Sequence, residues 1–504
     1  MKLESLYVTV CLCLVSLGGK TEIRPQKGTE KTDIPAGSMV LTLERTVDMA
    51  RKNSPSAVAA RHTFRSAYWN YRSFRANYLP SLILSSNPDL TRTINKITLP
   101  DGSEKYVSQN MLTLDGALTV QQNIPFTGGS FYVESALQRM RLFDSATTSF
   151  RTFPIVVGYN QSLFGYNSLK WDRKIEPLRF RQAKKSYIEA LELVSAEAVD
   201  RFFALVQAQS NYEMACFNYA NADTLYRFAR GRYEIGTITE NELLQLEINK
   251  LTESTNKMDA LIEMDDCRQA LSTFLGLSKE IFLTVKSEME VPCFKIDPRK
   301  AFELFNQNSP DMESLKIRLF QSRSEVAQAR SNAGLKADLY LECGLSQTGG
   351  SFQQAYRRPL DQQQVRLGVS LPVLDWGRGK GKIKVAESRE ELVKIQVEQD
   401  RNNLEMNIRK LVLQFNLQSE RVAIALKTDS TARRRNEVAR KLYLLGKSSI
   451  LDLNAAVSEK DTASRNFLNA LHTYWRLYYM LRSMTLYDFK QDQEITENYE
   501  QLEN

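Results

Sequence analysis

The tripeptide Asn53-Ser54-Pro55 recurs in the second half of the chain as Asn308-Ser309-Pro310. Each copy lies inside an amphipathic helical pattern that leads into alternating, strand-like sequence. A very long helical pattern follows and ends at a lone glycine, Gly236 in the first half and Gly446 in the second. Because this order of elements is used twice, the sequence predicts an internal duplication.

The two halves keep the same length between their strands and their glycine. Phe164 and Gly236 are 72 residues apart, as are Leu374 and Gly446. A helix of about 65 residues is roughly 100 Å long, much longer than a globular core. We therefore expect two short helices stacked end to end beside each long one. These shorter patterns cover about 43–78, 239–275, 301–333 and 448–484.

The composition argues against an enzyme or a nucleic-acid-binding protein. The 504 residues include 67 Lys and Arg and 59 Asp and Glu, and the charges are mixed along helix faces as on solvated surface. The only histidines are His62 and His472, and no phosphate-binding loop, nucleophile elbow or metal-ligand spacing occurs. We expect no catalytic residue, no cofactor and no metal.

The first residues are typical of an export signal. Lys2 precedes a short apolar stretch that ends at Gly18-Gly19, so residues 1–19 are predicted to be a signal peptide. A buried first helix is the alternative. Cys216 and Cys267 lie on opposite arms of the first hairpin with an offset of about 16 Å along the arms, which argues against a disulfide.

The domain organisation follows from these patterns. We expect a signal peptide at 1–19, an N-terminal extension at 20–40, a first repeat at 41–276, a linker at 277–298, a second repeat at 299–489 and a C-terminal tail at 490–504. The barrel strands of the two repeats are placed at 81–164 and 336–374. Residues 20–38 and 490–504 are expected to be disordered.

The strand regions alternate between apolar and polar residues with a period of two. A half-buried sheet in a soluble sandwich shows the same alternation. The export signal, the lack of another core for the strands to cover and segments of about ten residues favour a membrane barrel. One chain has too few strands to close a barrel, and open edges cannot face lipid, so several chains must share it. The predicted apolar face contains Leu112, Leu114, Leu118, Val120, Leu339, Leu341, Leu345, Val365, Leu367, Val369 and Leu371.

The first strand region is 45 residues longer than the second. The excess contains a turn at 124–129 and is most simply an extra β-hairpin, so four or six strands per chain remain possible. The polar turns at 100–102 and 347–363 are expected to be exterior loops.

Tryptophan and basic residues follow each strand region, as is typical of a chain that leaves a bilayer. An ordinary polar helix start is the alternative. The predicted membrane-interface belt contains Lys170, Trp171, Arg173, Trp376, Arg378 and Lys380.

The first long helix carries a heptad pattern. Tyrosines recur every seven residues at Tyr212, Tyr219, Tyr226 and Tyr233, and the alanines at 208, 215, 222 and 229 recur three positions after or four before a tyrosine. Large residues at one heptad position and alanines at the other predict close, coiled-coil packing. A plain two-stranded coiled coil would share this pattern but would not explain the strands or the duplication.

These features together resemble the TolC-like outer-membrane efflux family over about residues 41–489. The resemblance depends on the order and spacing of several motifs. These motifs are Ala76-Asn77-Tyr78-Leu79-Pro80-Ser81-Leu82, Leu371-Pro372-Val373-Leu374-Asp375-Trp376-Gly377, Tyr233-Glu234-Ile235-Gly236 and Tyr443-Leu444-Leu445-Gly446. The resemblance implies a homotrimer in which outer-membrane strands form one shared β-barrel and long helices form a periplasmic tunnel. It implies three partners, namely outer-membrane lipid, a periplasmic adaptor and an inner-membrane pump.

The resemblance also implies sites. The adaptor-docking tips would be Ile235, Gly236, Thr237, Leu445, Gly446 and Lys447. The gate at the closed end of the tunnel would use Tyr443 and Asp452, with Glu242 in the first half. The alternative is that Glu242 and Asp452 only begin helices near the positive end of the helix dipole.

The predicted function is the exit duct of a tripartite pump that exports small molecules from the periplasm. A duct for type I protein secretion and, in a different class, a soluble periplasmic coiled-coil adaptor or scaffold are the alternatives. An adaptor would lack lipid-facing strands.

Overall fold

A computed structural model describes residues 39–98, 100, 102–277, 283–286, 292, 294–445 and 447–499. The predicted signal peptide, nearly all of the predicted N-terminal extension and Gly446 lie outside the described residues.

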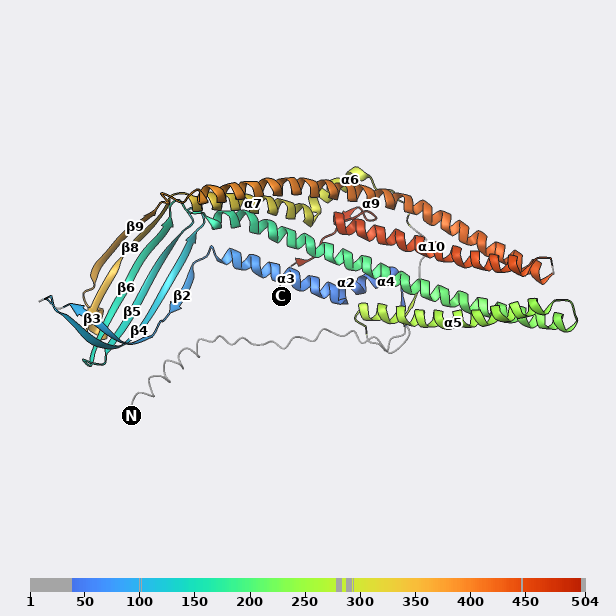
Figure 1. Cartoon of the computed structure of the whole chain (residues 1–504), viewed down its shortest axis with the longest axis horizontal. Coiled ribbons are helices and arrows are strands. Elements are labelled where there is room, and N and C mark those ends of the chain that lie inside the picture. Colours follow the sequence, from blue (N-terminus) through green and yellow to red (C-terminus); the bar gives the residue numbers. More distant parts are fainter. Residues whose placement is uncertain are drawn as a thin grey trace, which may run out of the picture.

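The molecule is a long rod with a β-sheet at one end (Figure 1). Helices α4 (Ser168–Glu234) and α9 (Arg378–Leu444) have 67 residues each and run from the sheet to the opposite end. Their equal lengths confirm the predicted duplication, since each begins directly after a strand region and ends at a turn.

Short helices lie along the two long ones in stacked pairs, as predicted. Helices α2 (Leu43–Asn53) and α3 (Pro55–Ala76) contact the sheet-side part of α4, and α5 (Glu240–Phe274) contacts the rest of it. In the second half, α6 (Pro298–Asn308) and α7 (Pro310–Ala333) contact the sheet-side part of α9, and α10 (Ile450–Thr485) contacts the rest. Because α7 and α10 also contact α4, the rod is a wall of neighbouring helices.

The repeated Asn-Ser-Pro tripeptide breaks each pre-strand helix in two, where the sequence pattern predicts one continuous helix. The amide of Ser54 donates to the carbonyl of Ala50 and ends α2, while its hydroxyl accepts from the amide of Ala57 and begins α3. Ser309 has the same double role between α6 and α7. The following proline lacks an amide hydrogen and fits the first turn of the new helix.

The sheet has six strand positions among the described residues. The pairing order is β2-β4-β5-β6-β8-β9, and β3 extends the position of β2 along the same neighbour β4. All these pairs are antiparallel. The strands are β2 (Ser81–Ser85), β3 (Asp89–Thr98), β4 (Glu104–Ile124), β5 (Gly129–Leu142), β6 (Thr147–Ser162), β8 (Lys336–Gly349) and β9 (Leu360–Ser370).

Three details of the strand prediction need correction or completion. The extra hairpin exists, because the turn after Ile124 joins β4 to β5 and gives the first half four strand positions against two in the second. The expected length of about ten residues is wrong for β4, which has 21. The predicted loop at 347–363 contains a short helix, α8 (Phe352–Ala355), whose Ala355 is fully buried against the sheet.

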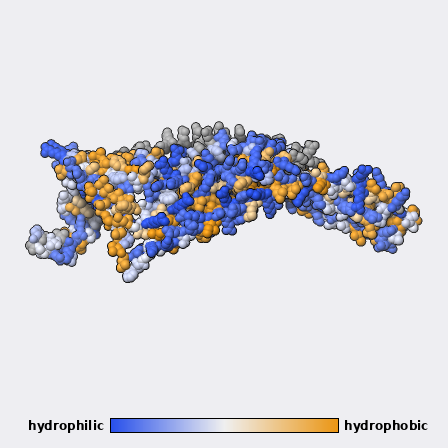
Figure 2. Space-filling model, turned by 90° about the horizontal axis from the view of Figure 1, so that it is seen from above, coloured by the Kyte–Doolittle hydropathy of each residue, from blue (hydrophilic) through white to orange (hydrophobic). Residues whose placement is uncertain are grey.

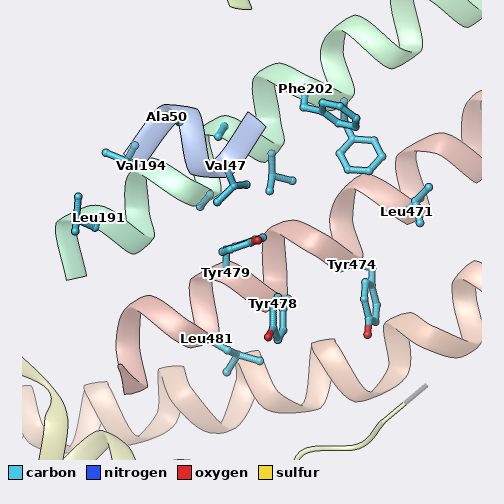
Figure 3. Packing of buried hydrophobic residues seen from close by; sticks show 14 of the residues in the cluster. Val47, Ala50, Leu191, Val194, Phe202, Leu471, Tyr474, Tyr478, Tyr479 and Leu481 are labelled. Atoms are coloured by element: carbon cyan, nitrogen blue, oxygen red, sulfur yellow. The ribbon is translucent and has the colours of Figure 1, made fainter. Parts of the chain in front are cut away.

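The core is a seam between helices rather than a ball. Figure 3 shows Val47 and Ala50 of α2 beside Val194 of α4, with Tyr479 of α10 on the other side of the seam. Phe202 of α4 and Leu471 of α10 are fully buried in the same cluster.

The predicted heptad seam is confirmed on α4. Its alanines at 208, 215, 222 and 229 are buried. Of the tyrosines, Tyr219 and Tyr226 lie under the ammonium groups of Lys257 and Lys250 of α5, 5.5 and 5.1 Å from the ring centres. The small residues therefore let helices approach closely, while the large ones pack under lysine stems.

A buried ion network joins the helices near the middle of the rod. The carboxylate of Glu192, fully buried on α4, accepts hydrogen bonds from Arg51 of α2 at 2.8 Å and from Arg482 of α10 at 2.8 and 3.1 Å. Arg482 also pairs with Asp488 at 2.8 Å. No sequence pattern points to this network, because its members are far apart in the chain.

The ends of the described chain fold back onto the helices. Strand β1 (Met39–Leu41) pairs in parallel with β7 (Leu283–Val285) of the predicted linker. Glu497 pairs with Arg51 at 2.6 Å, and the ring of Tyr499 lies 5.3 Å from that of Phe64. The predicted disorder of the C-terminal tail is therefore wrong for residues 490–499, because aromatic and ionic contacts hold them.

Replacing Glu192 with alanine should destabilise the protein by about 3–5 kcal/mol, because Arg51 and Arg482 would lose the fully buried carboxylate that they share and keep only Glu497 and Asp488, one each. Thermal unfolding in detergent measures the loss. The matched control is Glu197→Ala on the same helix, which breaks only an exposed pair with Arg201 and should cost about 0.5 kcal/mol or less. Similar losses for both variants would contradict a structural role for the network.

Candidate functional site: sheet faces, junction and helical tips

The two faces of the sheet differ in chemistry. The strand register places Val120, Val133, Val157 and Cys343 in one row, so the apolar faces predicted for separate strands form one continuous face. Leucines and valines on this face are largely exposed in the single chain, from 38% for Leu114 to 75% for Val365. Figure 2 shows apolar residues gathered at the sheet end of the molecule. An exposed apolar face of this size needs lipid or another protein to cover it.

The opposite face is polar and internally bonded. Tyr132 extends across Gly158, where an added Cβ would lie 2.1 Å from the tyrosine ring. The Tyr132 hydroxyl reaches the Tyr340 hydroxyl at 2.8 Å and donates to Glu342 at 3.0 Å, and Gln362 donates to the same carboxylate at 2.9 Å. This face is therefore suited to line an aqueous space.

The predicted belt residues lie where the sheet meets the helices. Lys170, Trp171 and Arg173 are in the first turns of α4, and Lys174 lies over the Trp171 ring at 5.3 Å. Trp376 precedes α9 with a positive φ of 55° and is 90% exposed. Arg378 and Lys380 follow it, both exposed.

Asp375 fixes the start of α9. Its carboxylate accepts from the amides of Gly377 at 2.9 Å and Gly379 at 2.7 Å, and these hydrogen bonds lower its pKa. A Cβ on Gly379 would crowd this carboxylate at 2.8 Å. The Leu374-Asp375-Trp376-Gly377 motif is therefore a capped strand-to-helix turn that presents the tryptophan outward.

The first tip is a tight, capped turn. After α4 ends, the amide of Gly236 donates to Tyr233 and that of Thr237 donates to Arg232, both at 2.9 Å, which is the Schellman pattern. Gly236 has a φ of +73°, a conformation that favours glycine. Ile235 is 74% exposed at the end of the molecule, so an apolar side chain projects from the tip.

The second tip repeats this geometry in its described part. The amide of Lys447 donates to the carbonyl of Leu442 at 2.9 Å, as Thr237 does in the first tip. Leu445 is 69% exposed, as is Leu451 at 68% in the next helix. Gly446 itself lies outside the described residues.

The two acidic gate candidates hold equivalent positions as helix caps. Glu242 and Thr239 exchange hydrogen bonds in a capping box that begins α5. Asp452 and Ser449 form the same box at the start of α10, with the Ser449 hydroxyl donating to the carboxylate at 2.7 Å. The hydroxyl and amide of Ser449 lower the pKa of Asp452, so its carboxylate is charged at neutral pH. Both carboxylates therefore act as helix caps, which is the role that the sequence analysis gives as the alternative to a gate.

Tyr443, near the end of α9, is within electrostatic range of charged groups of the first hairpin. Burial raises its pKa, Arg232 at the end of α4 lowers it and Glu242 raises it again. Tyr443 is therefore close to two charged groups of the first tip. Within the described residues no hydrogen bond joins Tyr443 to Asp452, so one chain brings Tyr443 to Glu242 but not to its predicted partner.

The sequence analysis missed Arg232 and the capping serine and threonine. The Thr-x-x-Glu and Ser-x-x-Asp spacings of the two boxes were visible signals. Arg232 gave no signal, because its proximity to Tyr443 depends on how the two hairpins pack. Cys216, Cys267 and Cys343 are free, which confirms that the first two do not form a disulfide.

None of the helices in the described ranges combines the length and the apolar character needed to cross a membrane.

The arrangement defines a class of protein: a chain with an apolar-faced sheet at one end and, about 100 Å away along its 67-residue helices, capped helical hairpins at the other. Residues 302–484, from α6 through α10, match the family model described as outer membrane efflux protein. The family model covers most of the second repeat, and over these residues the resemblance predicted from the sequence is confirmed. Curated protein sequences give no match.

Solved structures with the same fold are outer-membrane channels. CmeC of Campylobacter jejuni superimposes with a TM-score of 0.65 at 16% identity, over 91% of this chain and 88% of that one. VceC of Vibrio cholerae superimposes with a TM-score of 0.63 at 14% identity, over 90% of this chain and 96% of that one. The open state of the MtrE channel of Neisseria gonorrhoeae superimposes with a TM-score of 0.58 at 14% identity, over 88% of each chain. At these identities the likeness shows a common fold.

Replacing Gly236 with valine should strain the first tip by about 1–3 kcal/mol, because a β-branched residue resists a positive φ. No atom lies within 4 Å of the added Cβ, so the effect should stay local. We expect assembly to persist while transport fails, measured by detergent light scattering and by export from cells. The control is Gly231→Val inside α4, which should retain transport. Loss of assembly in Gly236→Val would mean that the glycine serves folding only.

The gate is tested by Tyr443→Phe combined with Asp452→Asn, which removes a hydroxyl and a charge while leaving an acceptor for Ser449. Each lost hydrogen bond is worth about 0.5–1.5 kcal/mol. Planar-bilayer recordings should show higher conductance and weaker cation preference. Because the pKa of Asp452 is lowered, the wild-type preference should persist to pH values below the ordinary titration of aspartate. Unchanged conductance and selectivity would leave Asp452 as a helix cap alone.

Proposed function

We propose that this chain is one subunit of a homotrimeric exit duct that exports small molecules through the outer membrane as part of a tripartite pump. The observation that carries the proposal is the continuous apolar sheet face, joined to helices that end in capped, apolar tips. The family match of residues 302–484 supports the efflux role.

The sheet edges support assembly into a shared barrel. Strands β2 and β3 pair only with β4, and β9 pairs only with β8, among the described residues. Unpaired strand edges cannot face lipid, so each edge needs a strand from another copy. With three copies, six strand positions per subunit give eighteen.

The helical wall has unpartnered edges too. On α5, apolar residues with heptad spacing are exposed, including Leu244, Ile248, Leu251, Met258 and Ile262. On α9, at the other edge, Leu413, Leu417, Ile424 and Val438 are exposed. Helices α4 and α10 lie between these two edges. In a closed ring the α5 edge of one copy would meet the α9 edge of the next and bury both apolar rows.

The tips support docking of a periplasmic adaptor. Exposed Ile235, Leu445 and Leu451 give an apolar surface at the end of the tunnel, with Thr237 and Lys447 beside it. Such a surface suits the ends of another helical protein. Cross-linking at Ile235 followed by identification of the captured inner-membrane and periplasmic proteins would distinguish a drug pump from a protein-secretion system.

Light scattering in detergent should give the mass of a trimer. Ile248→Glu should weaken the trimer, because a charge would enter the α5–α9 seam. Gln245→Glu, which adds the same charge on the same helix outside the seam, should leave it intact. A monomeric wild-type mass with intact β-structure would exclude the proposed duct.

A further inference from the structure

Three arginines on the apolar face of the sheet have no carboxylate partner. Arg92 of β3 and Arg139 and Arg141 of β5 are exposed, and no ion pair links them to a carboxylate in the described part of the chain. An arginine on a lipid-facing surface is costly near the middle of a bilayer and tolerated near its interfaces. Their position along the strands therefore matters.

The register places all three on the apolar face. Arg141 is opposite Leu112 and Arg139 is opposite Leu114 across the β4–β5 pair. Leu90, two residues before Arg92, is also opposite Leu112. Because side chains alternate between faces, Arg92 shares the face of Leu90.

The register also places them at the outer end of the apolar band. On β4 the band runs from Val120 to Leu112, about 27 Å along the strand and about 20 Å along the membrane normal for a tilted strand. Arg141 is level with the last leucine, and Arg92 is opposite Asn110, one row further out. This end carries the predicted exterior loops, so the arginines lie at the outer interface.

Two of the arginines, Arg139 and Arg141, lie over aromatic rings rather than beside acids. The guanidinium of Arg139 lies over the Phe150 ring at 5.9 Å, and that of Arg141 lies over the Phe143 ring at 5.5 Å. Of the carboxylates at this end of the sheet, Glu104 pairs with Lys96 at 2.5 Å, and Asp144 accepts from the Asn110 amide at 3.1 Å. Neither forms an ion pair with the three arginines in the described part of the chain, so the guanidinium groups can bind an anion from outside the chain.

The outer leaflet of a bacterial outer membrane consists largely of lipid A derivatives, whose sugar headgroup carries phosphates. Guanidinium groups bind phosphate oxygens in a bidentate manner. Arg92 and Arg141 are on the strands either side of β4, about 10 Å apart across the sheet and about 7 Å apart along it. Their side chains can therefore contact two phosphates of one headgroup.

We propose that Arg92, Arg139 and Arg141 form a binding site for the phosphorylated headgroup of lipid A, which fixes the depth of the sheet in the outer leaflet. The site rests on the proposed membrane orientation of the sheet. The ring of Phe150, opposite Arg139 and within the apolar band, would contact the acyl chains of the same lipid.

The test compares binding of fluorescent lipid A, with and without its phosphates, to the purified full chain in detergent. The wild type should prefer the phosphorylated form. In the triple variant Arg92→Gln, Arg139→Gln and Arg141→Gln, the affinity for the phosphorylated lipid should fall about fivefold per charge, or about a hundredfold in all. Each arginine near an anionic surface contributes about 1 kcal/mol to binding. The control is Lys105→Gln, Arg151→Gln and Arg366→Gln, which removes the same charge from the other face and should bind as the wild type does.

Equal wild-type binding of the two lipid forms, or full binding by the triple arginine variant, would overturn the site. Competition by inorganic phosphate at the same concentration as the lipid would show a free-anion site and overturn the assignment to lipid. Light scattering and conductance of the same samples separate the two proposals. A trimeric, conducting protein without phosphate-dependent lipid binding retains the duct and loses only this site.

Discussion

A helix of 67 residues must be covered by neighbours along its whole length, and this constraint organises the molecule. Neither α4 nor α9 can bury its apolar residues in a compact core, so each requires partners over about 100 Å. The stacked helices supply these partners, and the Asn-Ser-Pro breaks let the sheet-side partners change direction without losing hydrogen bonds. The buried Glu192 network joins α2, α4 and α10 near the middle of the rod, where the sheet-side short helices end and α5 and α10 begin to cover the long ones.

Much of this fold could be predicted from the sequence because its signals are periodic and long. The spacing from Phe164 to Gly236, repeated from Leu374 to Gly446, predicted two long helices of equal length, and both have 67 residues. The alternation along the strands predicted their apolar face, since a period of two specifies the face without knowledge of the partner strand. The extra hairpin was visible as a difference in length between two otherwise matched halves.

What could not be predicted depends on residues far apart in the chain. The folding of residues 490–499 against the helices needs Arg51 and Phe64 as partners, and a polar tail gives no local sign of them. Helix α8 is held through Ala355, a small residue in a polar loop. The gate shows the same limit: the family resemblance pointed to Tyr443 and Asp452, but packing of the hairpins places Tyr443 near Arg232 and Glu242.

The two halves have diverged where geometry permits it. The helices cannot change length separately, because both hairpins must extend equally far from the sheet for Tyr443 to stay within electrostatic range of Arg232 and Glu242. The strands can change in number, because a barrel accommodates more strands by becoming wider. In the proposed trimer, the extra hairpin makes the barrel wider without adding a helix to the wall. The helices must therefore spread apart where they join the sheet. At this junction the Tyr78 hydroxyl, just before β2, donates to the Leu169 carbonyl in the first turn of α4, and the Ser331 hydroxyl in α7 donates to the Phe164 carbonyl just after β6. These bonds therefore join the helix ends to the segments that lead into and out of the strands.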